Sequence, residues 1–164
     1  MVVCYKRLEG VSRAAPETPK TKIWPDSTTR PGESNTEWLL RMLLQDIQTL
    51  ASDAEDLIRA YPPMISAADE VVSDLFDHLE FAERFVQEGL VTQGMLDKVK
   101  AVDAVIHEMS DRHDGSLWTD DAVRTRGEWR EIRLLAREAL ASLGYDLEPP
   151  PPAEKTMKVF RARN

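Results

Sequence analysis

Two histidines of this sequence each follow an aspartate by four positions. Asp74 precedes His78, and Asp103 precedes His107. Residues four apart share one face of a helix, so each pair places a carboxylate beside an imidazole. Two such pairs on neighbouring helices could bind a metal ion. However, the carboxylate-bridged di-iron pattern needs Glu three residues before each His, and the sequence has Leu and Ala there. We therefore expect two solvent-facing ion pairs and no metal site.

A second polar cluster comprises His107, Glu108, Asp111, His113 and Asp114. Such a cluster could supply an acid–base pair or a metal loop. It lacks the alternating Asp/Asn ligands and the closing Glu of a calcium loop. We expect a loop at a helix end, where the neighbouring cations offset the helix dipole.

Other patterns typical of catalysis are missing from the sequence. The single cysteine, Cys4, has no His or Asn arrangement that would activate it, and one cysteine cannot form an intrachain disulfide or a Cys-based zinc cluster. The seven glycines are scattered singly, which excludes a glycine-rich phosphate loop. We therefore predict that the protein is not an enzyme and has no cofactor.

The elements that would position these residues are helices. Apolar residues recur at spacings of three and four over 37–61, 66–88, 93–109 and 119–143, with a break expected at Gly127. Ser34 and Glu37 form a capping-box pattern, and Pro62 with Pro63 ends the first segment. Short connections favour an all-α, antiparallel four-helix bundle. The expected core includes Leu43, Ile47, Leu50, Leu75, Leu79, Ile106 and Ile132.

Charge and proline content divide the 164 residues into three regions. The predicted regions are a flexible basic arm (1–33), a helical bundle (34–148), and a polyproline linker with a basic tail (149–164). The net charge is −8, which argues against nucleic-acid binding. No apolar run is long enough for a membrane helix, and the N-terminal apolar run is too short for a signal peptide. We expect a bacterial-type cytoplasmic protein.

The predicted second helix has a strongly acidic outer face. Within 34–89 there are 12 acidic residues and three basic ones. This imbalance exceeds what solubility requires, so we expect the face to bind a basic protein. The alternative is a solvated acidic face that has no partner. The proposed contact residues are Asp69, Asp74, Asp77, Glu80 and Glu83, together with Trp118 as an anchor near a loop. Alternatively, Trp118 and Trp129 together close the end of the bundle.

A weak sequence resemblance covers 117–144. There the chain has Leu-Trp-Thr, then Glu-Trp-x-x-Ile-Arg-x-Leu-Ala-Arg-Glu-Ala-Leu, then Leu-Gly. This pattern resembles the C-terminal part of small acidic bacterial helical proteins, some of which are regarded as immunity proteins of polymorphic or contact-dependent toxin systems. The resemblance implies a toxin-neutralising role and no catalytic residues.

Three classes of function follow from the sequence. The first is a non-enzymatic binding protein, in its concrete form an immunity protein that neutralises a basic toxin, such as a nuclease. The second is a structural or adaptor module in a larger assembly, and the third is a metal-dependent helical-bundle enzyme. The favoured first class predicts a monomer or homodimer with a basic protein partner.

Overall fold

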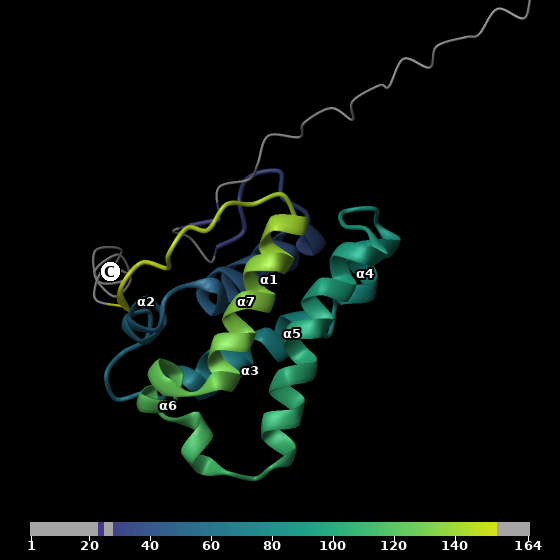
Figure 1. Ribbon diagram of the computed structural model, residues 1–164. Coiled ribbons are helices and arrows are strands. Elements are labelled where there is room, and N and C mark those ends of the chain that lie inside the picture. Colours follow the sequence, from purple (N-terminus) through teal and green to yellow (C-terminus); the bar gives the residue numbers. More distant parts are fainter. Residues whose placement is uncertain (1–22, 25–27, 154–164) are drawn as a thin grey trace, which may run out of the picture.

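The computed structural model describes residues 23–24 and 28–153 of the chain (Figure 1). This part is helical and contains no β-strand, so the all-α prediction is confirmed for it. Cys4 and most of the predicted basic ends lie outside the described residues. The elements are α1 (Asn35–Ala51), α2 (Ala54–Arg59), α3 (Ala67–Leu79), α4 (Ala82–Gln87), α5 (Gln93–Asp111), the 3-10 helix η1 (Gly115–Trp118), α6 (Asp120–Thr125) and α7 (Gly127–Ser142).

Two predicted helices are broken. The first divides at Ser52, whose backbone is extended (φ −72°, ψ 163°), into α1 and α2. The second divides at Phe81 into α3 and α4. The break expected at Gly127 is confirmed, because α6 ends at Thr125 and α7 begins at Gly127. The antiparallel four-helix arrangement stays a prediction.

Side-chain caps fix several helix starts. The Ser34 hydroxyl accepts a hydrogen bond from the Glu37 N–H at 3.1 Å, and the Glu37 carboxylate accepts one from the Ser34 N–H at 2.7 Å. This pair is the predicted capping box. Ser66 and Thr92 cap α3 and α5 in the same way, since their hydroxyls accept from backbone N–H groups of the first turn. Each cap satisfies donors that a helix start leaves free.

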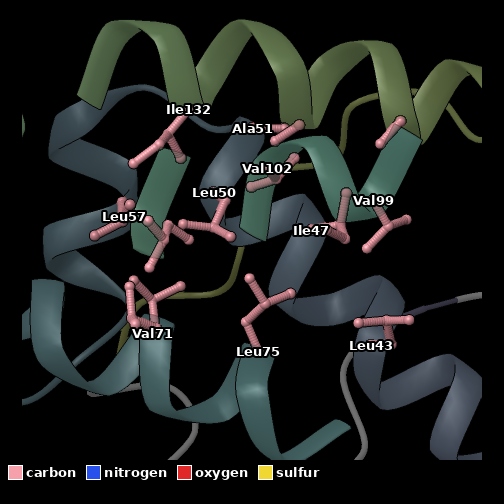
Figure 2. Packing of buried hydrophobic residues seen from close by; sticks show 14 of the residues in the cluster. Leu43, Ile47, Leu50, Ala51, Leu57, Val71, Leu75, Val99, Val102 and Ile132 are labelled. Atoms are coloured by element: carbon pink, nitrogen blue, oxygen red, sulfur yellow. The ribbon is translucent and has the colours of Figure 1, made fainter. Parts of the chain in front are cut away.

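The core lies where α1, α3, α5 and α7 meet. Helix α7 packs against both α1 and α5, and α3 packs against α1. Figure 2 shows their side chains converging in one cluster, which includes Leu43, Ile47, Leu50, Val71, Leu75, Val99, Val102 and Ile132. Of the predicted core residues only Leu79 is not buried. It is half-buried because it is the last residue of α3, where the chain turns toward α4.

Helix α1 is buried on nearly all sides. Besides its apolar residues, the polar side chains of Thr36, Arg41, Asp46, Gln48 and Thr49 are buried. Two further segments cover it: the N-terminal strap (residues 23–24 and 28–33) and the C-terminal strap (residues 145–153). The Trp24 indole N–H donates to the carbonyl of Glu148 at 3.1 Å, so the two straps touch.

Parts of both straps are buried against the helical body. Ile23 is buried, although we expected residues 1–33 to lie largely outside the core. Pro150 and Ala153 are buried as well, although they belong to the predicted linker and tail. The physical reason is that the polar side chains of α1 bind the strap backbones, as described below. In the described part of the chain, none of the helices has the length and apolar character needed to cross a membrane.

Candidate functional site

Four of the predicted partner-binding acids form an exposed group, which we call the acidic surface: Asp69, Asp77, Glu80 and Glu83. Asp69 and Asp77 lie on α3, Glu80 is its C-cap residue, and Glu83 lies in the first turn of α4. Within the described part of the chain, none of these four carboxylates has a hydrogen-bond or salt-bridge partner. The acidic surface thus presents four negative charges to solvent.

Asp74 does not belong to this exposed group. It is half-buried, and its carboxylate accepts a hydrogen bond from the Tyr61 hydroxyl at 3.2 Å. Tyr61 lies in the loop between α2 and α3, so this contact ties the loop to α3. Asp74 thus has a role inside the fold, and its predicted role in partner binding stays a prediction.

His78 also has a different partner from the predicted one. Its Nδ1 lies 2.6 Å from a carboxylate oxygen of Asp46, a residue of α1 that is only 7% exposed. The expected Asp74–His78 pair at the surface is thus replaced by a pair across the contact between α1 and α3. The sequence holds a signal for it, since Asp46 stands between the core positions Leu43 and Ile47 in the same helix.

Burial shapes the protonation of this cluster. It raises the pKa of Asp46 to about 7, although the hydrogen bond with His78 acts in the opposite direction. Burial lowers the pKa of His78, but the Asp46 carboxylate outweighs it, so the pKa of His78 is raised. Burial raises the pKa values of Tyr61 and Asp74 as well. The cluster therefore retains protons at higher pH than free side chains would.

The second histidine pair keeps its predicted neighbours, but the hydrogen-bond partner of the His107 Nδ1 is the backbone carbonyl of Asp103, at 3.1 Å. The Nδ1 of His107 lies 3.1 Å from a carboxylate oxygen of Asp103, and His107 is exposed. The His107 ring also packs against Phe76 of α3, with ring centres 5.1 Å apart. The two histidines thus lie in separate pairs. Across 23–24 and 28–153, no three or more His, Cys, Asp or Glu residues are grouped so as to hold a metal ion.

The polar cluster spans the end of α5: His107, Glu108 and Asp111 lie in the helix, which continues further than expected, and His113 and Asp114 lie in the loop that follows it. His113 has a positive φ of 53°, and the Asp114 carboxylate accepts from the Ser116 N–H at 2.9 Å, which starts η1. Arg112 forms an ion pair with Glu128 of α7 at 2.6 Å. These contacts fix the turn between α5 and the next helices.

Trp118 is half-buried and packs edge-to-face against Trp129, with ring centres 6.1 Å apart. The Trp129 indole N–H donates to the carbonyl of Leu117 at 2.8 Å. The Trp118 carbonyl accepts a hydrogen bond from the Ser66 hydroxyl at 3.2 Å. This geometry matches the alternative in which the two tryptophans close one end of the helical body. It corrects the expectation of an exposed anchor.

Comparisons with known proteins add no relative: no family model, curated protein or solved structure matches the chain.

Proposed function

We propose that the protein is a non-enzymatic binding module whose acidic surface docks a basic protein, and that this partner is a toxin neutralised by the complex. In this proposal, the antiparallel four-helix bundle is the scaffold that presents the surface. The partner's basic cleft, in the case of a nuclease its nucleic-acid-binding cleft, receives the carboxylates as it would receive phosphates.

The observation that carries the proposal is the unrelieved charge of the acidic surface. Asp77, Glu80 and Glu83 are exposed and follow one another at intervals of three residues. The one arginine of 67–88, Arg84, forms an ion pair with Glu88 at 2.9 Å, outside the acidic surface. Asp77 and Glu80 are like charges three residues apart at the end of α3, and such a pair destabilises a helix by a few tenths of a kcal/mol. Glu83 adds a further negative charge from α4, beyond the break at Phe81. A partner rich in Lys and Arg removes this repulsion on binding.

Electrostatic steering gives the proposal a kinetic consequence. Opposite charges raise the association rate, and added salt weakens that attraction because it screens exposed charges. Binding through the acidic surface therefore has to weaken strongly as the salt concentration rises.

A pull-down from the source organism at low and high salt tests the proposal. The wild type and two variants serve as bait. The first variant, called the bait variant, carries D77K, E80K and E83K together. A matched control carries E108K, D111K and E131K, three exposed acids elsewhere on the body, and has the same net charge as the bait variant. We expect a partner that the wild type and the control retain at low salt and that the bait variant loses. Equal retention by the bait variant excludes the acidic surface as the docking site.

A further inference from the structure

Helix α1 carries a polar stripe that faces other parts of the chain. Arg41, Gln45 and Gln48 follow one another at intervals of four and three residues, which places them on one face. Each donates to a backbone carbonyl of a strap. Arg41 donates to Thr28 at 2.8 Å, Gln45 to Ile23 at 3.0 Å, and Gln48 to Asp146 at 2.8 Å. The stripe thus binds the backbone of both straps.

Gln48 binds the C-terminal strap in two directions. Its amide N–H donates to the Asp146 carbonyl, and its amide oxygen accepts from the Glu148 N–H, each at 2.8 Å. Residues two apart in an extended chain turn their backbone groups to the same side. A peptide added to a sheet edge is bound through its backbone in the same way. Gln48 is 1% exposed, so its amide is held rigidly in the fold.

The N-terminal strap also binds the C-terminal strap, through the side chain of Trp24. The Trp24 indole N–H donates to the Glu148 carbonyl at 3.1 Å. Gln48 and Trp24 together therefore bind the carbonyl of Asp146 and both backbone groups of Glu148. Figure 1 shows the C-terminal strap, in yellow, leaving α7 and running past the purple N-terminal segment.

The contacts with Gln48 and Trp24 are made by the backbone of the strap. The residues Leu147, Glu148 and Pro149 are exposed, whereas Pro150 is buried. The sequence then continues with prolines to position 152, which favour an extended polyproline II conformation. The site therefore selects the backbone of a segment that has a free N–H just before a run of prolines, of which Pro150 is buried.

We propose that Gln48 and Trp24 form a binding site for an extended, proline-rich peptide of a second protein, and that residues 146–150 occupy this site in the free protein. The site is thus closed by the chain's own strap. A peptide of a second protein competes with the chain's own strap, which is tethered through Gly144 and therefore has a high effective concentration. The apparent affinity of that peptide is its intrinsic affinity multiplied by the fraction of time that the site is open. This site is separate from the acidic surface and does not depend on it.

The substitution E148P tests the proposal in the full-length chain. Proline lacks the N–H that donates to Gln48 and favours the same extended backbone, so the strap is weakened at one contact. The control E148A keeps the N–H. The probe is a fluorescein-labelled peptide of residues 144–153, followed by fluorescence anisotropy. We expect E148P to bind the probe at least tenfold more tightly than the wild type, and E148A to bind it within twofold of the wild type.

The same probe carrying the E148P change should bind at least tenfold more weakly than the unchanged probe. Equal affinities of wild type and E148P for the unchanged probe, or equal affinities of the two probes, would overturn the proposal. Circular dichroism confirms that the variants keep their helices. Light scattering gives the oligomeric state of each protein. A dimeric wild type together with a monomeric E148P would also overturn the proposal, because the strap in the site would then belong to a second copy of the chain.

A measurement on the wild type alone covers the case in which E148P does not fold. In ¹⁵N-labelled full-length protein, the Glu148 amide should exchange more slowly than the Leu147 amide because Gln48 accepts its hydrogen bond. Excess unlabelled 144–153 peptide should displace the strap and speed exchange of the Glu148 amide at least threefold. Unchanged exchange at saturating peptide would contradict the proposal.

Discussion

Asp46 lies among the core positions of α1 and is nearly as buried as they are. An unpaired carboxylate in such a place is costly, and a pair with His78 at 2.6 Å offsets that cost. Tyr61 and Asp74 form the adjoining hydrogen bond at 3.2 Å. The contact between α1 and α3 therefore includes a group of side chains whose stability depends on how many protons they hold.

The protein should become less stable as the pH rises from 5 to 8, by on the order of 2 kcal/mol. The pKa of Asp46 is raised from 3.8 to about 7, so the folded state holds a proton that the unfolded state releases. Stability therefore falls as the pH rises through this window. Urea titrations at a series of pH values measure the slope.

The substitution D46N should flatten this slope, because it removes the carboxyl that holds the extra proton. The control D103N changes the exposed histidine pair and should leave the slope as in the wild type. A slope that stays steep in D46N would mean that Asp46 is not the group that titrates. Acids with lowered pKa values, such as Glu33, act in the opposite direction, but they do so below their ordinary value of 4.5 and outside this window.

At the scale of the elements, the end of α1 depends on a distant helix. The Arg133 guanidinium donates to the carbonyl of Ser52 at 2.9 Å, and the Arg137 guanidinium donates to that of Ala51 at 2.8 Å. These carbonyls have no partner within α1, because the last turn of a helix leaves its acceptors free. Two cations of α7 therefore satisfy the negative end of the α1 dipole.

Replacing Arg133 with Ala should lower the free energy of unfolding by about 1–3 kcal/mol, because the carbonyl of Ser52 loses a charged donor. Arg133 also donates to the carbonyl of Val123 at 3.1 Å, so α6 is loosened as well. The control R130A removes an exposed arginine from the same helix and should cost less than about 0.5 kcal/mol. Chemical unfolding followed by circular dichroism compares the two, and equal costs would contradict a capping role for Arg133.

The contact of Arg133 and Arg137 with the end of α1 shows which part of the fold the sequence could not predict. The apolar spacing identified every long helix, because it reports which face is buried. The break at Ser52 was missed because the stripe of 37–61 continues through it. The break is stabilised by Arg133 and Arg137, which are some eighty positions further along the chain. The local sequence offers only a helix-start signal, Asp53 as N-cap with Glu55 and Asp56 in the first turn of α2, and it does not identify the two arginines.

The sequence also predicted only part of the candidate site. Exposure of Asp69, Asp77, Glu80 and Glu83 followed from helical periodicity alone. The contacts of Asp74 and His78 did not, because their partners belong to other elements, the loop before α3 and helix α1. A histidine four residues after an aspartate has an attractive local partner, and only the packing of α3 on α1 shows that a more distant one is used.

At the scale of the whole molecule, the straps join the helices into one unit. Arg41 of α1 is 2% exposed and Glu33 of the N-terminal strap is 8% exposed in their side chains. Two hydrogen bonds of 2.8 Å link their charged groups in the bidentate geometry that makes Arg–carboxylate pairs strong. The strap is thus fixed to the centre of the fold by a buried ion pair.

The substitution E33Q should therefore destabilise the entire helical body, by about 1–3 kcal/mol at pH 7, because it leaves the buried Arg41 guanidinium without its opposite charge. Urea unfolding should give the same lowered midpoint by tryptophan fluorescence and by circular dichroism. A midpoint lowered in fluorescence alone would mean that the strap unfolds separately. The control E55Q breaks the exposed ion pair with Arg124 and should leave the midpoint nearly unchanged.

The pH dependence of the E33Q effect gives an independent check. The hydrogen bond with Arg41 lowers the pKa of Glu33 below its ordinary value of 4.5, so the stability that the pair contributes is present above that pH. It is lost as the pH falls through the lowered pKa, because the protonated carboxyl is neutral, as Gln is. The difference between wild type and E33Q should therefore shrink as the medium is acidified. A difference that stays constant down to the acid limit of folding would show that E33Q acts through lost packing and not through the lost charge.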